Sequence, residues 1–417
     1  MSQSTSERAS FHGWRVAFVS AVANAAAMGL GTLNLGLFVQ PMEADIDVSR
    51  TVFGSAGSVR QVAGAVTSPF IGRMIDRHGV RWLLPIVTVI TCLCLAALAW
   101  IDAGWQLLLV FGVIGLCGMI GPGQLLTNVP VTKWFVQLRP KAIAYMSLGI
   151  PVGAMVFMPL TQYLIDTFGW RQAWVGLAIL GVLIICPICL LWMRREPEDH
   201  GQQPDGGMAT DNLSDHTLQE YPWTLEQARR QPVFWLIAFT MGMVAFAIST
   251  IAFHRLPEFV DKGLDPMVVG LAIAWDAVLA GMATFGVGML GGRVHVRWVG
   301  LVGFTCLGLG VIGTIYVTDF TTLIIAMTVW GLGIGVMMFV SNLIWAEYFG
   351  RANAGTIRGF VTPITLLLGA SGGPIAGFIY DNSGSYDIMW WVSAGLMFLS
   401  ALTIACSKPP VPPSSSI

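Results

Sequence analysis

The sequence predicts an all-α membrane protein in which twelve transmembrane helices form two six-helix bundles related by pseudo-symmetry. Three observations lead to this fold class. The 417 residues are 55% apolar and only 11% charged, whereas about 25% of the residues of a soluble globular chain are charged. Twelve apolar runs are each long enough to cross a hydrocarbon core of about 30 Å. The two halves of the chain also match each other at a nearly constant offset.

The twelve apolar runs are divided equally between the two halves of the chain. We place them at 16–39, 52–70, 82–101, 106–131, 142–165, 173–191, 233–253, 267–290, 299–317, 323–346, 359–379 and 388–406. The first run is too long for the core of a signal peptide, and no small-residue cleavage site follows it. We therefore expect it to stay in the mature protein as the first transmembrane helix.

Lys and Arg follow the positive-inside pattern if both termini lie in the cytoplasm. Of the 22 basic residues, 17 fall in segments that this topology places inside and four in segments that it places outside, which leaves Arg60 within a run. No basic stretch is available for binding nucleic acid. We expect a multi-pass protein embedded in the lipid bilayer of the cell (inner) membrane, with both termini cytoplasmic and no nucleic-acid partner.

A shift of 216 positions places the first half of the chain on the second. It matches Arg77 with Arg293 and Trp82 with Trp298. Two parallel repeats related by an axis along the membrane normal are a known transporter architecture. The expected domains are an N-terminal six-helix bundle at 1–192, a cytoplasmic linker at 193–231 and a C-terminal six-helix bundle at 232–417. Within the linker, Thr224 is the expected N-cap of a short amphipathic helix on the membrane surface.

The loop between the second and third runs carries a recognisable motif. Its sequence is Gly72-Arg73-Met74-Ile75-Asp76-Arg77-His78-Gly79-Val80-Arg81. Glycines permit close helix approach and a tight turn, and Asp76 can meet a helix N-terminus or a basic partner. A solvated turn is the alternative, because turns favour the same residue types.

This loop resembles the signature of the major facilitator superfamily, G-x-x-x-D-[RK]-x-G-x-[RK], and so implies the major facilitator fold. The resemblance also implies a conformational latch that joins the two halves on the cytoplasmic side. Its residues would be Gly72, Asp76, Arg77, Gly79 and Arg81. The second half has Gly292 in place of Asp76, so we expect the latch in one half only.

Shorter segments narrow the resemblance to the monocarboxylate and oxalate/formate porter branch. They are His12-Gly13-Trp14-Arg15, Phe168-Gly169-Trp170-Arg171 and Gln231-Pro232-Val233-Phe234-Trp235. Members of this branch move small organic anions, often with a proton or in exchange. The resemblance implies a secondary active transporter that moves a monocarboxylate-like anion by alternating access, through proton symport or exchange with a counter-substrate. The alternative is efflux of a larger or neutral compound, because the run from Gly149 to Gly153 is similar to a drug/proton antiporter signature.

Two ionisable residues lie near the middle of apolar runs, where a charge is costly unless it faces a cavity or a partner. Arg60 lies in the second run and Asp276 in the eighth, and their numbers differ by the repeat offset. We expect both to face the interface between the halves at similar depth. Arg60 is either a clamp for a substrate carboxylate or a structural arginine. Asp276 is either the proton-coupling group or half of a structural ion pair.

The basic residues typical of the branch are missing. Monocarboxylate porters commonly have Arg four positions after the Asp of the eighth run, where this chain has Ala280. Oxalate/formate exchangers use a Lys in the eleventh run, and the eleventh run of this chain has none. An anionic substrate is then expected to bind Arg60, with Arg358 and Arg255 as the less favoured cations. Together with His254 and Glu258, Arg255 is expected to form either a charge cluster at headgroup level or an outer gate.

Polar and aromatic residues of the first, fourth, seventh and tenth runs should line the cavity, by analogy with the superfamily, although each could instead join helices. Besides Arg60, the expected substrate-binding residues are Asn34, Gln124, Asn128, Trp330 and Asn342. Metal-binding clusters, nucleophile elbows and phosphate loops are missing from the sequence. We therefore expect no enzyme activity, cofactor or metal, and as partners a small-molecule substrate and a proton or counter-substrate.

Overall fold

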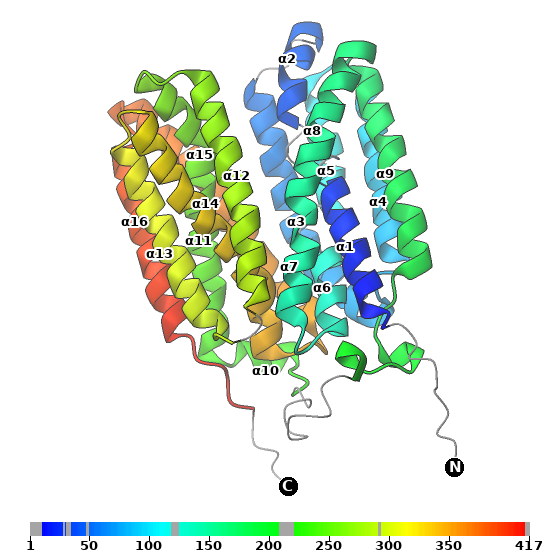
Figure 1. The fold of residues 1–417 in the computed structure, drawn as a ribbon. Helices are drawn as coiled ribbons and strands as arrows, with labels where there is room; N and C mark the ends of the chain where they lie inside the picture. Colours follow the sequence, from blue (N-terminus) through cyan, green and yellow to red (C-terminus); the bar gives the residue numbers. More distant parts are fainter. Residues whose placement is uncertain are drawn as a thin grey trace, which may run out of the picture.

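The computed structural model describes residues 11–27, 30, 35–46, 50–117, 125–207, 221–290 and 293–412, and its regular elements in these ranges are helices. They form two upright bundles (Figure 1). The first and last described residues and the short helix α10 (Leu225–Arg229) lie at the same end of the molecule (Figure 1). We refer to this end as the terminal end.

The first bundle is built from the helices that precede residue 193. They are α1 (Gly13–Ala27), α2 (Leu35–Ile46), α3 (Arg50–His78), α4 (Leu83–Ala97), α5 (Gly104–Leu116), α6 (Leu125–Trp134), α7 (Arg139–Ser147), α8 (Gly149–Phe168) and α9 (Trp170–Trp192).

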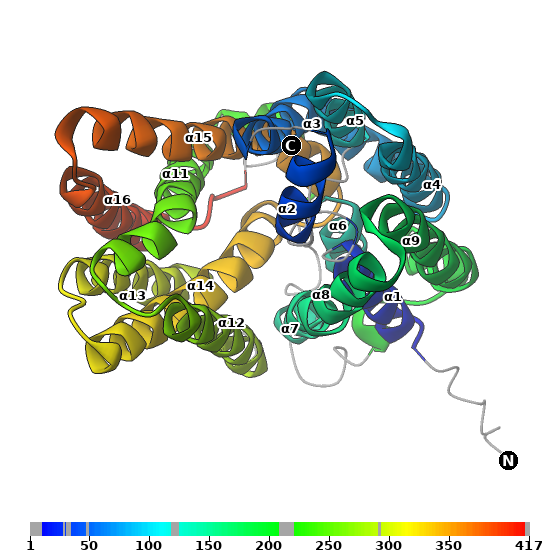
Figure 2. The ribbon, with the colours of Figure 1, turned by 90° about the horizontal axis from the view of Figure 1, so that it is seen from above.

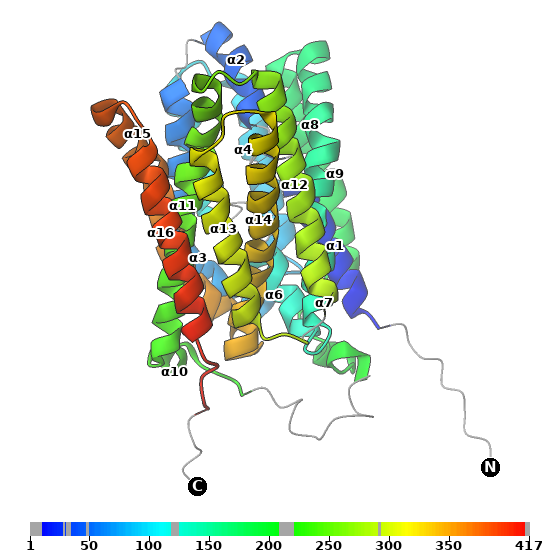
Figure 3. The same cartoon turned by 60° about the vertical axis from the view of Figure 1, so that its left-hand side comes forward.

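The second bundle follows the linker, and in it α13 and α16 pack side by side (Figure 3). Its helices are α11 (Pro232–Asp261), α12 (Pro266–Met289), α13 (Val296–Ile315), α14 (Phe320–Phe349), α15 (Ala354–Ser383) and α16 (Asp387–Cys406). The linker contains two short 3-10 turns, η3 (Glu198–His200) and η4 (Pro204–Gly207), followed by α10. Thr224 caps α10 as expected, because its side chain accepts a hydrogen bond from the backbone of Gln227.

Within the described residues, nine helical segments are long and apolar enough to cross a membrane. The first and fourth expected spans each consist of two shorter helices, α1 with α2 and α5 with α6, separated by residues outside the described part. The second span, α3, is long enough but contains several charged residues, including Arg60, Arg73 and Asp76. Together with the nine segments, these three spans make up the twelve that the sequence predicts.

Several helices extend beyond the apolar runs that predicted them. The run at 233–253 becomes α11 (Pro232–Asp261), and the run at 359–379 becomes α15 (Ala354–Ser383). A hydropathy run stops at the first charged residue, whereas the backbone hydrogen bonds of the helix continue past it. Arg255 and Arg358 therefore lie within helices rather than at their ends.

The pseudo-symmetry is visible in how the helices pack. Gly115 of α5 packs on the backbone of Arg60 in α3, and Gly331 of α14 packs on the backbone of Asp276 in α12. The offset of 216 relates the two pairs. Arg60 and Asp276 thus occupy equivalent helix crossings in the two bundles.

The bundles meet where α3 packs on α15 and where α7 packs on α12 (Figure 2). At the first crossing, a side chain on Gly72 would collide with the backbone of Gly355, and one on Gly359 would collide with Ser68. Small residues of this kind let membrane helices approach closely.

Candidate functional site

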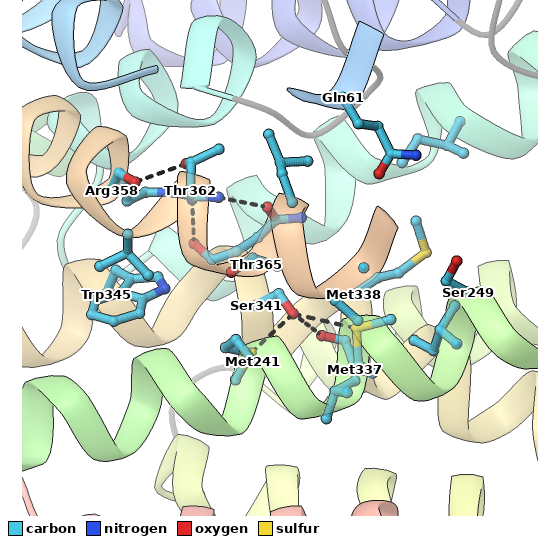
Figure 4. A pocket seen from close by; sticks show the side chains of 18 residues that line it. Gln61, Met241, Ser249, Met337, Met338, Ser341, Trp345, Arg358, Thr362 and Thr365 are labelled. Atoms are coloured by element: carbon cyan, nitrogen blue, oxygen red, sulfur yellow. Dashed lines mark hydrogen bonds between the residues drawn. The ribbon is translucent and has the colours of Figure 1, made fainter. Parts of the chain in front are cut away.

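A cavity of about 420 Å³ lies between the bundles (Figure 4). Its walls come mainly from α11, α14 and α15 of the second bundle, with Gln61 of α3 and Ile150 of α8 from the first. Its polar lining residues are Gln61, Ser249, Ser341, Asn342, Arg358, Thr362 and Thr365. The volume lies in the range of about 300–1,000 Å³ that is typical of small-molecule sites.

Arg358 is the one charged residue in the described lining of this cavity. Its guanidinium donates hydrogen bonds to the side-chain oxygen of Asn128 in α6 and, at 3.3 and 3.4 Å, to the backbone and side-chain oxygens of Asn342 in α14. Asn128 also donates to the backbone oxygen of Asn342 at 3.3 Å. Arg358 thus joins Asn128 and Asn342, two of the expected substrate-binding residues, across the interface between the bundles. The sequence had favoured Arg60 over Arg358 as the cation of the site.

The partners of Arg358 are all neutral. Among the described residues, no carboxylate lies within 4.0 Å of its guanidinium. A guanidinium inside a membrane protein is costly unless an anion or several dipoles compensate for its charge. In the described residues, the charge of Arg358 is therefore compensated by the dipoles of Asn128 and Asn342 and not by an anion.

Asp276 is paired with Arg255 rather than with Arg60. Its Oδ2 accepts a hydrogen bond of 2.6 Å from Arg255 Nη2. Arg255 is only 8% exposed, and its guanidinium lies 5.1 Å from the centre of the ring of Trp330, which is 5% exposed. This placement corrects the expectation of a headgroup-level charge cluster at the end of the seventh run, because Arg255 pairs with Asp276 near the middle of α12.

Arg60 lies in a different environment from Asp276 despite the symmetry of their positions. Its guanidinium lies 5.9 Å from the centre of the ring of Phe111 in α5, within the first bundle. Its neighbour Gln61, not Arg60 itself, is among the residues that line the cavity. The structure does not bring Arg60 and Asp276 into one site.

Asp76 connects α3 to the N-terminus of α15. Its carboxylate accepts hydrogen bonds from the backbone N–H groups of Gly355, at 3.1 Å, and Thr356, at 2.6 Å. An anionic side chain in this position satisfies the free N–H groups and complements the helix dipole. Lys133 of α6, which is 3% exposed, lies 3.4 Å from Asp76 and 2.8 Å from Glu196. A network of charges therefore joins the two bundles at the terminal end.

The other residues of the loop motif have different surroundings. Gly72 lies at the contact of α3 with α15, and Gly79 adopts a φ of 75°, which favours glycine. Arg81 donates a hydrogen bond of 3.2 Å from Nε to the carbonyl of Leu190, within the first bundle. Arg77 is exposed at the terminal end. Gly72 and Asp76 of the motif therefore contact the second bundle.

Comparison with known proteins assigns the family. The sequence profile of the Major Facilitator Superfamily matches residues 17–262. The chain belongs to the major facilitator superfamily. It is therefore a membrane transporter and not an enzyme.

Among relatives in this superfamily, human monocarboxylate transporter 11 is 26% identical over 422 residues, covering 96% of this chain and 84% of the relative. The hexuronate transporter of Bacillus subtilis (strain 168) is 23% identical over 382 residues, covering 87% of each chain. The sialic acid transporter NanX of Escherichia coli (strain K12) is 22% identical over 345 residues, covering 80% of this chain and 78% of the relative.

Solved structures of the superfamily have the same fold. The human organic anion transporter MFSD10 superposes with a TM-score of 0.74 at 14% identity, covering 94% of this chain and 99% of the other. The proton:xylose symporter XylE superposes with a TM-score of 0.72 at 14% identity, covering 94% of each chain. At this level of identity the likeness concerns the fold.

The linker of this major facilitator protein takes part in the contacts at the terminal end. Glu198 pairs with Arg351 of the second bundle, and Arg351 also donates to the carbonyl of Lys133 at 3.0 Å. Burial alone would raise the pKa of Glu198, but the hydrogen bond and charge of Arg351 outweigh it and hold the pKa below its ordinary value. Further along, the buried carboxylate of Asp205 accepts hydrogen bonds from the backbone of residues 136–138. These linker contacts were not foreseen from the sequence.

Two of the expected substrate-binding residues, Asn34 and Gln124, lie outside the described residues. Asn24, a polar residue of the first run, is buried and donates to the carbonyl of Met146 at 3.2 Å, joining α1 to α7. Ser249 lines the cavity. Lys133 could have been suspected from the sequence, because it is a cation two residues after an apolar run, but nothing in the sequence indicates its partners.

Proposed function

We propose that this protein is a secondary active transporter that moves a small organic anion by alternating access, with proton symport or exchange as its coupling. The observation that carries the proposal is Arg358, the single cation in the described lining of the cavity, with neutral partners only. A carboxylate in the cavity would provide the opposite charge and accept charge-assisted hydrogen bonds. The names of several relatives, which refer to monocarboxylates, hexuronate and sialic acid, support an acidic substrate.

Arg358 is better placed than Arg60 for direct contact with the substrate. Arg358 lines the cavity, whereas Arg60 lies against Phe111 of its own bundle. Asn128 and Asn342 then orient the guanidinium of Arg358 as well as bind the substrate. Arg60, Trp330, Asn34 and Gln124 stay as further candidates for the site, each to be tested by substitution.

For proton coupling we propose Asp276 together with Arg255. Protonation of Asp276 would remove the negative charge from a close buried pair and leave Arg255 in need of another anion. Such a change favours a rearrangement of α11 and α12, which carry the two residues. A proton could thereby bias the equilibrium between the inward-facing and outward-facing states.

We also propose that the terminal end lies in the cytoplasm of the cell (inner) membrane, following the distribution of Lys and Arg. Asp76, with Gly72, Arg77, Gly79 and Arg81 in the same motif, then forms the latch of the cytoplasmic side. The contacts of Asp76 with α15 hold that side together. They must break when the transporter opens toward the cytoplasm.

The test is uptake by proteoliposomes of a panel of radiolabelled monocarboxylates, driven by an imposed pH gradient. We expect Arg358→Gln to reduce anion uptake by more than tenfold, and Asn128→Ala to reduce it less, because that variant removes a hydrogen bond between the bundles while keeping the cation. Arg60→Gln in the same assay compares the two arginines. Equal losses in Arg358→Gln and Asn128→Ala would assign Arg358 to packing of the bundles and refute the proposal.

Transport of an uncharged compound by wild-type protein, unaffected by Arg358→Gln and with no transport of anions, would instead support the alternative of an exporter of neutral or larger compounds.

A further inference from the structure

Two arginines meet at the terminal end of the first bundle, just before α4 begins and just after α9 ends. Arg81 Nε donates a hydrogen bond of 3.2 Å to the carbonyl of Leu190, and Arg194 Nη1 donates to the same carbonyl at 3.4 Å. Arg194 Nη1 also donates to the carbonyl of Met193 at 2.9 Å. The last carbonyl groups of a helix carry partial negative charge. They hold the two guanidinium groups together at the end of α9.

No anionic side chain lies opposite this pair of cations. Among the described residues, no carboxylate is within 4.0 Å of either guanidinium. Burial, and after it the charge of Arg81, lowers the pKa of Arg194 below its ordinary value. Within the same part of the chain, Arg81 donates only from Nε and Arg194 only from Nη1. The remaining N–H groups are therefore available to an anion from outside the chain, which would also reduce the repulsion between the two like charges.

The position of the pair in the molecule indicates where this anion comes from. The guanidinium of Arg81 lies 5.7 Å from the centre of the ring of Trp82, which is 62% exposed, and Trp192 at the end of α9 is 38% exposed. Exposed tryptophans at the ends of membrane helices favour the headgroup layer. The helices α4 and α9 pack side by side on the flank of the first bundle that faces away from the second (Figure 2). The two arginines thus lie at headgroup level, apart from the cavity between the bundles.

Apolar surface adjoins the pair along both helices. The helices are in contact directly beneath it, because Cys189 Sγ of α9 donates a hydrogen bond of 3.7 Å to the carbonyl of Arg81. Farther from the terminal end, Leu93 of α4 and Leu183 of α9 are both exposed. The acyl chains of a lipid whose headgroup binds the arginines would make dispersion contacts with this surface.

We propose that Arg81 and Arg194 form a binding site for the headgroup phosphate of an anionic phospholipid in the leaflet at the terminal end. A guanidinium presents a planar set of donors that matches phosphate, and basic residues near the membrane surface attract anionic lipids. A zwitterionic lipid is disfavoured because it would bring its own cation to the two arginines. Inorganic phosphate has the same chemistry, but it cannot use the apolar surface of α4 and α9. This site does not depend on the substrate of the central cavity.

The experiment measures binding of lipid to the delipidated full-length protein in detergent by native mass spectrometry. The two lipids are dioleoyl phosphatidylglycerol and dioleoyl phosphatidylcholine, which have the same acyl chains and differ in net charge. We expect the wild-type protein to bind phosphatidylglycerol about tenfold more tightly or better. Arg194→Gln should weaken binding of phosphatidylglycerol by about fivefold, and the double variant Arg81→Gln/Arg194→Gln by about 25-fold. Arg194→Lys keeps the charge and should retain most of the affinity.

Arg73→Gln is the matched control. Arg73 is an exposed arginine of α3 whose guanidinium lies 5.9 Å from the centre of the ring of Phe70. Its replacement should leave the binding of phosphatidylglycerol unchanged. Because Arg194 is only half-buried, we expect Arg194→Gln to fold, and size-exclusion chromatography checks this for every variant.

Three results would overturn the proposal. The first is equal binding of the two lipids by the wild-type protein. The second is an affinity for phosphatidylglycerol that Arg194→Gln leaves unchanged, or that Arg194→Gln and Arg73→Gln lower equally. The third is complete displacement of phosphatidylglycerol by an excess of inorganic phosphate, which would assign the two arginines to a soluble anion.

Discussion

Replacement of Asp76 by Asn should open the terminal end of the protein. The carboxylate accepts two backbone hydrogen bonds from the first turn of α15 and lies 3.4 Å from Lys133. Hydrogen bonds to a charged group contribute about 1.5–3 kcal/mol each. Asn keeps one acceptor oxygen but loses the charge. Lys133 is not left without a counter-charge in this variant, because Glu196 still neutralises it. We therefore expect the closed arrangement to lose about 2–3 kcal/mol. The ratio of closed to open molecules should then fall by about 30- to 160-fold.

The assay is a distance measurement by double electron–electron resonance between spin labels at two exposed positions, His78 at the end of α3 and Ala352 before α15. In a cysteine-free background, Asp76→Asn should add a population at longer distance. Asp102→Asn is the matched control, because it removes the charge of a side chain that is 84% exposed, away from this contact. If Asp76→Asn and the control give the same distance distribution as the parent protein, the reasoning about the latch is refuted.

Three further changes test other parts of the account. Asp276→Asn should abolish accumulation driven by a pH gradient while sparing exchange, and full accumulation in uptake assays would reject its role in coupling. Gly72→Val should place a side chain against the backbone of Gly355. We expect uptake to fall by more than tenfold, while size-exclusion chromatography shows no loss of folded protein. A normal transport rate would show that α3 and α15 need not approach closely. The Glu198–Arg351 pair should be intact above the ordinary Glu pKa of about 4.3 and weaken only as the pH falls through the lowered pKa of Glu198. Because that carboxylate is 50% exposed, the pair should contribute less than about 1 kcal/mol. In the same spin-label assay, weakening of the pair at acid pH should lengthen the distance between positions 78 and 352. Glu198→Gln should remove this acid-dependent change.

The sequence predicted the large-scale organisation because that information is repeated along the chain. The hydropathy pattern gave the spans, and the offset of 216 correctly indicated that Arg60 and Asp276 occupy equivalent positions, as their contacts with Gly115 and Gly331 show. The partners of Asp76 were also within reach, because an aspartate at the end of a helix has few alternatives to a helix N-terminus or a cation.

The detailed site could not be predicted, because charged residues interrupt the pattern used to find the helices. Arg255 and Arg358 each fall just outside an apolar run, so the sequence placed them at the membrane surface. The structure places both inside longer helices, one in α11 and the other in α15. The pairing of Arg255 with Asp276 depends further on how α11 and α12 are rotated about their axes, which hydropathy does not specify.

We propose that the charge of Arg358 selects an anionic substrate in the cavity between the bundles. The most direct measurement is the initial rate of pH-driven uptake of the best-transported monocarboxylate by wild-type, Arg358→Lys and Arg358→Gln proteins in matched proteoliposomes. We predict a rate at least tenfold lower in Arg358→Gln, with part of the activity retained in Arg358→Lys because the positive charge is kept but the planar set of donors is lost. Equal rates in the wild-type and Arg358→Gln proteins would contradict the claim.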